Sequence, residues 1–458
     1  MLKREYILTA LAALILAVAA SAAEPAKDLL TNGDFTAAGE GGLPQAWAVW
    51  KPEWTHAACT VRRTPEGLLV ESPPDEPLAV CGIEQKIGGV QGGQAYAVEA
   101  ACEVRSIASP FQSAIVRVEW TRGGKKCHPA GVLVRGPVVS GSAATFADVL
   151  VAPADADGAI ISLETKWLRG GSITWKRAGL KATPAPAARK VKVGTVFLRP
   201  KNSTPAKNLD LWCGQIEAAG RLGLDIVCLG EAILSVGTGA NLQAVAEPIP
   251  GPSTARLGAA AKQANLWVVA GLYERDGPRV YNTAVLLDRT GRVAGKYRKT
   301  HLPREEWKKG MTPGDEYPVF RTEFGTVGIM ICYDWFFPEA AEAFALRGAE
   351  ILFAPTWGNT LPDSPDGAVD GENTFRVRAR DNGLVLVPAV YDGSSMVIDP
   401  RGRILASNKG KEGVFWAEVD LTAREALPWV GRWRDIGPRD RRPETYGPLA
   451  APAGLAQP

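Results

Sequence analysis

The sequence predicts two domains of different class, an all-β domain followed by a layered α/β domain. Before residue 183, short segments with partial period-two alternation are separated by glycine turns, and no convincing helix is present. After residue 190, apolar strands alternate with helices. The segment between them, TPAPAARK (183–190), is a linker rich in proline and alanine. A chain of 458 residues with 46% hydrophobic content is sufficient for two cores.

The first domain, residues 28–182, is predicted to be a β-sandwich. Its clearest strands are Ala95–Arg105, Ala114–Thr121, Thr145–Val151 and Ile160–Leu163. Six tryptophans lie in this region: Trp47, Trp50, Trp54, Trp120, Trp167 and Trp175. Exposed rings would stack on sugars, but packing in the sandwich core is the more ordinary role for tryptophan.

The second domain, residues 191–448, alternates strands and helices. Its strands are expected at 192–198, 225–231, 266–274, 281–288, 327–332, 351–356 and 384–390. Its helices are expected at 209–222, 253–264 and 370–381, with another beginning near Pro338. Residues 449–458 are expected to form a C-terminal tail.

The start of the chain indicates export. It has two early cations, an apolar stretch from Ile7 to Ala20 and small residues after it. Residues 1–23 are therefore predicted to be a secretory signal peptide, cleaved after Ala22 or Ala23, and the mature protein to be secreted or periplasmic. An uncleaved anchor is the alternative. The mature part has no apolar run long enough to span a bilayer.

The seven cysteines agree with export. Cys213 and Cys228 fall on a predicted helix and strand, where core packing is their ordinary role. The odd count leaves at least one thiol free, and Cys332 is the natural candidate. The four cysteines before the linker allow two disulfides in any of three pairings: Cys59, Cys81, Cys102 and Cys127.

Charge and histidine content argue against two classes of function. A formal net charge of +3 gives no case for a nucleic-acid partner. The chain has only three histidines, His56, His128 and His301, so it offers almost no choice of ligands for a three-histidine zinc site. A Cys–His pair has a single candidate histidine, because the other two lie in the first domain.

Cys332 ends the apolar run VGIMIC and is followed by YDWFFPE. This pattern predicts a thiol where a buried strand, Val327–Cys332, meets a helix. Amides at a helix end lower the pKa of a thiol, which favours a nucleophile. For this segment alone, a small buried side chain is the simpler interpretation.

Two other residues offer what a reactive thiol needs. Glu231 ends the apolar segment 225–231, so its carboxylate is predicted at the sheet edge, in an apolar site that raises the pKa of a base. Lys299 follows a predicted strand pair, and its ammonium suits negative charge that develops on a carbonyl oxygen. Taken singly, each is also compatible with an ordinary surface charge.

Glu231, Lys299 and Cys332, in this order, resemble the Glu-Lys-Cys triad of the nitrilase (carbon–nitrogen hydrolase) superfamily. Their separations are 68 and 33 residues (299 − 231 and 332 − 299). The resemblance covers about residues 191–448, and the ordered set of motifs is specific although each is weak alone. The similar motifs are YRKTHLP (297–303), CYDWFFPE (332–339), EILFAPTWGN (350–359), RARDNG (378–383) and RRPETYGP (441–448).

The resemblance implies a mechanism that requires no metal and no organic cofactor. Cys332 attacks the carbonyl carbon, and Glu231 takes the thiol proton and hands a proton to the leaving amine. Lys299 and the backbone N–H of Tyr333 stabilise the oxyanion. Water then releases the acid from the thioester. A second, auxiliary carboxylate is expected at Glu306, with Glu305 as the alternative.

The resemblance also implies a fold and a pocket. The family fold is a four-layer αββα sandwich that associates helix to helix, so a homodimer or a larger homo-oligomer is expected. Trp357 and Asn359 are expected to line the substrate pocket, with the loop 358–369 at its rim.

A weaker resemblance concerns the first domain. DLLTNGDF (28–35), LPQAW (43–47) and SITWKRAGLKAT (172–183) are similar to the ends of galactose-binding-like jelly rolls, which include many carbohydrate-binding modules. This resemblance implies a jelly-roll fold and makes a glycan a possible partner.

Within the superfamily, the sequence favours a small-molecule amide or N-carbamoyl substrate. Tyr333-Asp334 follows the cysteine, where true nitrilases often have Trp-Glu. Leu229-Gly230-Glu231 replaces the Pro-Glu of many members, which changes the turn before the base but keeps the base itself. Nitrile hydrolysis by the same triad and a catalytically silent, nitrilase-like scaffold are the alternatives.

Overall fold

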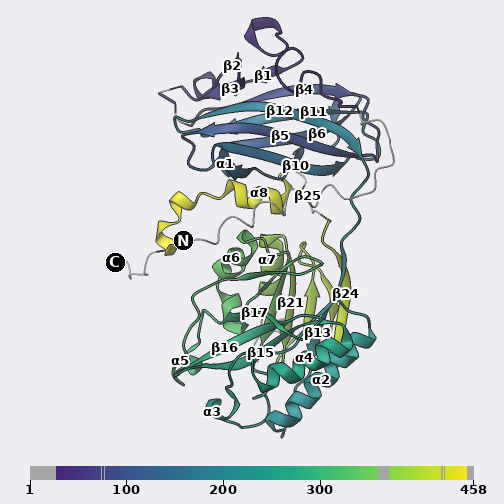
Figure 1. Ribbon diagram of the computed structural model, residues 1–458, viewed down its shortest axis with the longest axis vertical. Coiled ribbons are helices and arrows are strands. Elements are labelled where there is room, and N and C mark those ends of the chain that lie inside the picture. Colours follow the sequence, from purple (N-terminus) through teal and green to yellow (C-terminus); the bar gives the residue numbers. More distant parts are fainter. Residues whose placement is uncertain are drawn as a thin grey trace. The chain divides into compact units, whose positions relative to one another are not determined.

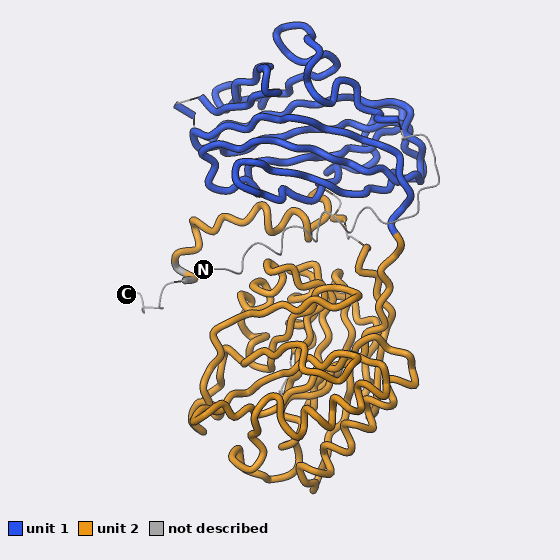
Figure 2. The backbone as a smooth tube through the Cα atoms, in the orientation of Figure 1, with its two compact units in different colours: residues 1–186 blue, residues 187–458 orange. Residues whose placement is uncertain are grey.

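The structure, a computed structural model, describes residues 27–73, 75–76, 78–358, 371–423, 426–427 and 429–450. The chain divides into two compact units, Met1–Pro186 and Ala187–Pro458 (Figure 1, Figure 2). The predicted signal peptide, Asn359 with the rest of its loop to residue 370, and residues 451–458 lie outside the described residues.

In the first unit, two antiparallel sheets of six strands share one hydrophobic core (Figure 1). One sheet has the order β1-β4-β11-β6-β7, with β8 beside β6: β1 (Ala48–Trp50), β4 (Val80–Gly88), β6 (Ala114–Arg122), β7 (Lys125–Lys126), β8 (Val132–Leu133) and β11 (Gly158–Lys166). The other has the order β2-β3-β12-β5-β10-β9: β2 (Thr60–Thr64), β3 (Gly67–Glu71), β5 (Ala95–Arg105), β9 (Val138–Ser140), β10 (Ala143–Val151) and β12 (Ser172–Thr183).

The predicted strands of the first unit are present, and β5 has the predicted bounds. β11 is longer than predicted because it pairs along its length with β4 on one side and β6 on the other. One short helix, α1 (Pro110–Ser113), was not predicted. The galactose-binding-like assignment stays a prediction.

The tryptophans of the first unit divide between core and surface. Trp47, Trp120 and Trp175 are buried, and the Trp175 ring centroid lies 5.7 Å from that of Phe146. Trp54, in contrast, is 75% exposed. Core packing therefore accounts for the three buried rings, whereas the Trp54 ring is exposed.

All seven cysteines are free thiols, so neither of the disulfides that the sequence allows is formed. Cys59 and Cys81 both contact the hydroxyl of Thr165, at 3.5 and 3.4 Å. Cys102 lies in β5, whereas Cys127 follows β7 in the other sheet.

In the second unit, two mixed sheets of six strands pack face to face, and helices cover their outer faces (Figure 1). The first sheet has the order β17-β16-β15-β14-β13-β24: β13 (Lys190–Phe197), β14 (Ile226–Cys228), β15 (Trp267–Asp276), β16 (Arg279–Leu287), β17 (Val293–Arg298) and β24 (Gly413–Asp420). The second has the order β18-β19-β20-β21-β22-β23: β18 (Val319–Arg321), β19 (Thr326–Ile329), β20 (Ile351–Thr356), β21 (Val385–Val390), β22 (Met396–Ile398) and β23 (Ile404–Ser407).

Two helices cover each sheet of the second unit. α2 (Pro205–Arg221) and α4 (Pro252–Ala264) pack on the first sheet through a core that contains Trp212 and Leu257. α6 (Pro338–Leu346) and α7 (Glu372–Asn382) pack on the second sheet through Phe344 and Phe375. The result is the four-layer αββα arrangement.

The second unit also has minor elements outside these layers. Its shorter helices are α3 (Leu242–Val245), α5 (Arg304–Trp307), α8 (Trp433–Asp440) and α9 (Gly447–Ala450). A two-stranded sheet joins β25 (Ala426–Leu427) to β26 (Gly431–Arg432).

Local signals explain where these elements begin. α2 starts four residues earlier than predicted, because the Thr204 hydroxyl accepts the backbone N–H of Lys207 at 3.2 Å and Pro205 occupies the first turn. α6 begins at Pro338, as predicted. No helix in the described part of the chain is both long enough and apolar enough to cross a bilayer.

Candidate active site

The three residues singled out by the sequence lie together, although they come from different strands. Glu231 follows β14, Lys299 follows β17 in the same sheet, and Cys332 follows β19 in the facing sheet. Lys299 Nζ lies 3.1 Å from Glu231 Oε1. The Cys332 thiol lines the same cleft as both residues, and the negative charge of Glu231 acts on it. The packing of the two sheets therefore brings an acid, a cation and a thiol to one place.

Glu231 is 3% exposed, and hydrogen bonds fix both of its carboxylate oxygens. Oε1 accepts from Lys299 Nζ and, at 2.7 Å, from Asn282 Nδ2. Oε2 accepts the backbone N–H of Trp357 at 2.6 Å. Because these donors surround it, the buried carboxylate is compensated and oriented.

The Leu-Gly-Glu turn has a structural reason. A Cβ atom at Gly230 would lie 2.2 Å from the hydroxyl oxygen of Tyr391. That hydroxyl donates to the backbone carbonyl of Glu231 at 2.8 Å. Glycine is therefore required here so that Tyr391 can hold the backbone of the candidate base.

Lys299 is 1% exposed and bridges two carboxylates. Its Nζ donates to Glu231 Oε1 and, at 3.0 Å, to Glu306 Oε1. Burial by itself would lower the pKa of Lys299, but the negative charges of Glu231, Cys332 and Glu306 raise it above its usual value, so the ammonium stays charged. Glu305, the alternative auxiliary carboxylate, is exposed and makes no such contact, although it lines the cleft.

Glu306 lies in α5 and is held by the same donors as Glu231. Asn282 Nδ2 donates to its Oε1 at 2.8 Å, whereas its Oε2 is buried without a hydrogen-bond partner in the described structure. Burial and the nearby charge of Glu231 raise the pKa of Glu306, although Lys299 opposes this effect.

Cys332 differs from the sequence prediction in two respects. β19 ends at Ile329, and Cys332 opens a short 3₁₀ turn (332–336) with φ +43°, in the left-handed region. Burial, followed by the negative charge of Glu231, raises the pKa of Cys332 to about 12, whereas the sequence had suggested a lowered value. The resting thiol is therefore protonated and depends on a base for activation.

Asp334 fixes the turn that carries Cys332, a role that the sequence did not reveal. It is fully buried and accepts the backbone N–H of Ile331 at 2.9 Å and of His301 at 3.0 Å, as well as the Tyr297 hydroxyl at 2.7 Å. These bonds tie the segment around Lys299 to the segment around Cys332. The His301 ring pairs with Asp334 at 2.8 Å instead of activating the thiol.

These residues open into a cleft of about 1220 Å³. Glu231, Lys299, Glu306 and Cys332 all line it, as does Trp357. Tyr333 also lines the cleft, next to Trp335 and Phe336, whose rings stack with centroids 3.9 Å apart. Asn359, the other predicted pocket residue, lies outside the described residues.

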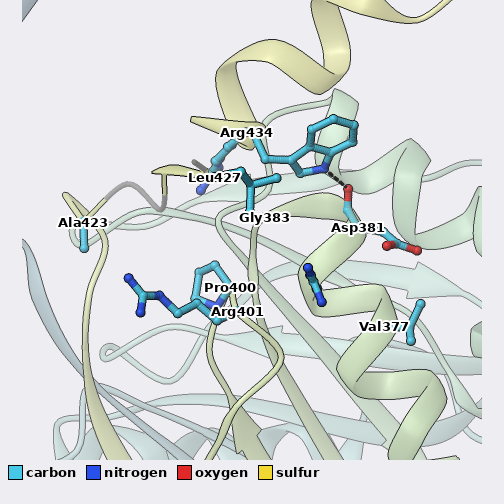
Figure 3. Close-up of a pocket in the computed structure, with 10 residues that line it drawn as sticks. Val377, Asp381, Gly383, Pro400, Arg401, Ala423, Leu427 and Arg434 are labelled. Atoms are coloured by element: carbon cyan, nitrogen blue, oxygen red, sulfur yellow. Dashed lines mark hydrogen bonds between the residues drawn. The ribbon is translucent and has the colours of Figure 1, made fainter. Parts of the chain in front are cut away.

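A second cavity of about 590 Å³ lies elsewhere in the second unit, between α7 and α8 (Figure 3). Its lining includes Arg380, Arg401, Arg434 and Trp433, and the Trp433 indole N–H donates to the backbone carbonyl of Asp381 at 2.6 Å. None of the predicted site residues lines this cavity. The cleft at Cys332 is therefore the candidate active site.

Known proteins match the second unit. The family model "Carbon-nitrogen hydrolase" matches residues 192–428. A nitrilase of Pyrococcus abyssi is 34% identical over 276 residues, which cover 56% of this chain and 99% of that protein. An omega-amidase of Bos taurus is 32% identical over 239 residues, which cover 48% of this chain and 85% of that protein.

Among solved structures, a carbon–nitrogen hydrolase from Helicobacter pylori G27 is 26% identical with a TM-score of 0.47, covering 57% of this chain and 98% of that chain. The family model spans just over half of the chain, and the Pyrococcus abyssi relative is matched over almost its whole length. The chain therefore belongs to the carbon–nitrogen hydrolase family, within the nitrilase superfamily.

Proposed function

We propose that the protein is an amidase that hydrolyses a non-peptide amide or N-carbamoyl C–N bond of a small molecule, with Glu231, Lys299 and Cys332 as its catalytic triad. The observation that supports this proposal is that these three side chains line one cleft, with Lys299 Nζ 3.1 Å from Glu231 Oε1. Since the similar proteins include both a nitrilase and an omega-amidase, the substrate is not transferred from either.

Acylation begins with the protonated thiol. Glu231 takes the proton of Cys332 as the sulfur attacks the carbonyl carbon, which forms the C–S bond and places negative charge on the carbonyl oxygen. Lys299, held as an ammonium, and the backbone N–H of Tyr333 stabilise this oxyanion. Glu231 then gives its proton to the leaving nitrogen, so that the C–N bond breaks and ammonia or an amine departs.

Deacylation uses the same groups. Water attacks the thioester carbon while Glu231 accepts one of its protons. Collapse of the second oxyanion breaks the C–S bond, releases the carboxylic acid and returns the proton to Cys332. Glu306 acts through Lys299, because its Oε1 accepts a hydrogen bond from the ammonium at 3.0 Å.

Two alternatives remain distinct from this proposal. Nitrile hydrolysis uses the same thiol and consumes two water molecules instead of one before the acid is released. A catalytically silent scaffold would keep the fold and the cleft without turnover. The amidase is favoured over the scaffold because a buried ammonium between two carboxylates is costly to maintain for packing alone.

A substrate screen with a trapped intermediate tests the proposal. Ammonia release is measured over amides, ureido acids and nitriles, and the intact protein is weighed after rapid quenching. We expect release from amides or ureido acids, with an acyl mass increment on the peptide that contains Cys332. Release from nitriles alone would favour the nitrilase. Neither release nor labelling of Cys332 by a thiol reagent would favour the scaffold.

We also propose that the protein is exported, that it forms homo-oligomers, and that its first unit binds a glycan. Edman sequencing of the mature protein would support export if the chain began at residue 23 or 24. Light scattering tests the oligomer.

Glycan binding by the first unit is tested at Trp54, which is 75% exposed and is the ring to replace in a glycan-binding assay. Unchanged binding in Trp54→Ala would exclude this ring as the sugar platform.

A further inference from the structure

Asn282 lies between the two carboxylates of the site. It belongs to β16, is fully buried and was not singled out from the sequence. Its Nδ2 donates to Glu231 Oε1 at 2.7 Å and to Glu306 Oε1 at 2.8 Å. One amide nitrogen thus uses both of its N–H groups on two different acids.

We propose that Asn282 is a positioning residue that holds Glu231 and Glu306 at a fixed separation and keeps Glu231 oriented as the base. The proposal rests on the proposed function, since it assigns a role within the same site.

Charge explains why an amide is needed at this position. Two carboxylates face one ammonium, Lys299, whose Nζ contacts the same two Oε1 atoms as the amide. A neutral amide adds two donors without adding charge, whereas an acid would add a third negative group and a second lysine would add another charge to desolvate. Oε1 of Glu231 accepts hydrogen bonds from two donors, whereas Oε2 accepts the backbone N–H of Trp357. Oε2 is therefore the oxygen with a lone pair free to take the thiol proton.

The unpaired amide oxygen of Asn282 indicates that the side chain is placed for the hydrogen bonds of its nitrogen. Asn282 Oδ1 is buried and has no hydrogen-bond partner in the described structure. A buried unpaired carbonyl costs free energy, which is tolerated where the N–H groups of the same side chain are needed.

Four other titratable groups of the site deprotonate at higher pH than a carboxyl group, whereas Glu305, an exposed acid, lines the same cleft. Burial raises the pKa of Cys332 to about 12, and it also raises the pKa of Tyr273 and Tyr391, while nearby negative charges raise the pKa of Lys299 against the opposing effect of burial. Burial and nearby negative charge raise the pKa of Glu306, so the acid limb of activity is expected to include this carboxyl group. N–H donation stabilises the charged form of a carboxylate, so removing Asn282 moves that limb to higher pH.

Asn208 provides a matched control. It is also fully buried, it also donates two hydrogen bonds, to the carbonyls of Ile233 (3.1 Å) and Val236 (2.8 Å), and its Oδ1 is also unpartnered. Its acceptors are backbone carbonyls, so its loss removes a comparable number of bonds without touching either acid. Asn208→Ala thus measures the purely structural effect.

The experiment compares Asn282→Ala, Asn282→Asp and Asn208→Ala in the full-length protein. kcat/KM is measured against pH, together with the pH dependence of Cys332 alkylation by iodoacetamide, followed by peptide mapping. We expect the acid limb of both profiles to move up by about one pH unit in Asn282→Ala and further in Asn282→Asp. We expect kcat to fall about 100-fold with KM changed less than about threefold, and Asn208→Ala to keep the wild-type profiles.

The two measurements separate the failure of this proposal from the failure of the proposed function. Alkylation needs no turnover, so it tests Asn282 even if no amide is hydrolysed. Unshifted alkylation and activity profiles in Asn282→Ala, with a loss of thermal stability equal to that of Asn208→Ala, would overturn the positioning role. If Asn282→Ala does not fold, Asn282→Ser retains one donor and is expected to show a smaller shift in the same direction; an unshifted profile there would equally reject the proposal.

Discussion

The two units are both built on a pair of six-stranded sheets but differ in what they bury. Each packs two six-stranded sheets around an apolar core. Among the described residues, the polar residues of the first unit that are buried as a whole are all neutral: Gln85, Ser113, Thr121, Ser162 and Thr165. The charged residues that are buried as a whole in the described chain belong to the second unit: Glu231, Glu274, Lys299, Asp334, Asp399 and Arg439. In the first unit the Asp148 side chain is 6% exposed, but it is paired with the exposed Arg135. Since burying charge is costly, this difference separates a core built for packing from one that carries a site.

Buried charge alone does not identify catalysis. Glu274 is as deeply buried as Lys299, but it is paired with Arg298 at 2.7 Å, with Lys296 and with the Thr283 hydroxyl at 2.9 Å, across three neighbouring strands. These partners compensate it fully and hold strands together. The site, in contrast, opens to a cleft and leaves Glu306 Oε2 unpartnered in the described structure.

The largest effect is expected for Cys332→Ala. Removing the sulfur eliminates the nucleophile, so kcat should fall by about 10³-fold or more while the fold is retained. Amide hydrolysis and thermal unfolding measure the two effects. Cys102→Ala in the first unit is the control and should keep full activity. Equal activity losses in the two variants would contradict the conclusion that the second unit alone carries the catalytic site.

Lys299→Met should affect both activity and stability. It leaves Glu231 and Glu306 buried without their shared cation, and breaking a buried ion pair costs about 3 kcal/mol. Urea denaturation at neutral pH should show this loss of unfolding free energy, and hydrolysis should fall to the level of Cys332→Ala. A stable, active variant would show that the ammonium is not needed for the oxyanion.

Glu274→Gln separates structural from catalytic buried charge. Loss of its ion pairs with Lys296 and Arg298 should reduce the free energy of unfolding by about 2 kcal/mol. The activity that remains in the folded fraction should match that of the wild type. A change in the pH profile of kcat/KM would instead place Glu274 within the catalytic network.

The smallest effect is expected for Glu306→Gln, and it depends on pH. Because the folded-state pKa of Glu306 is raised, the folded state binds more protons than the unfolded state between the ordinary glutamate pKa and the raised value. Wild-type stability should therefore fall relative to the variant as pH rises through this window, by about 1 kcal/mol. Urea midpoints at pH 4 and pH 8 test the sign. A difference that grows in the opposite direction would show a lowered pKa.

Much of the second unit was predictable because its signals are local. β20 lies at the predicted residues, since five consecutive apolar residues, ILFAP, specify a buried strand. The three residues at the centre of the site were found from the order and spacing of motifs, and the structure brings them together. The length of β19 was not predictable, because Asp334 turns the chain through contacts with residues more than thirty positions away.

Residues that act by contact with other side chains were missed. Asn282 is a polar residue in a strand that ends in a run of apolar residues, and only the facing carboxylates show what it does. The direction of the Cys332 pKa shift was also wrong, because helix-end amides are a local feature whereas burial and Glu231 come from the tertiary fold.

The close approach of Gly230 to Tyr391 has an evolutionary consequence. A side chain at position 230 meets the phenol oxygen at 2.2 Å, so substitution there is tolerated only after the aromatic ring has been replaced by something smaller. If Gly230 is replaced by a larger residue, the Tyr391 hydroxyl can no longer reach the backbone carbonyl of Glu231, and selection for tyrosine at position 391 is relaxed. The two positions, 161 residues apart in the chain (391 − 230), are thus expected to mutate as a pair, with either single change less fit than the double.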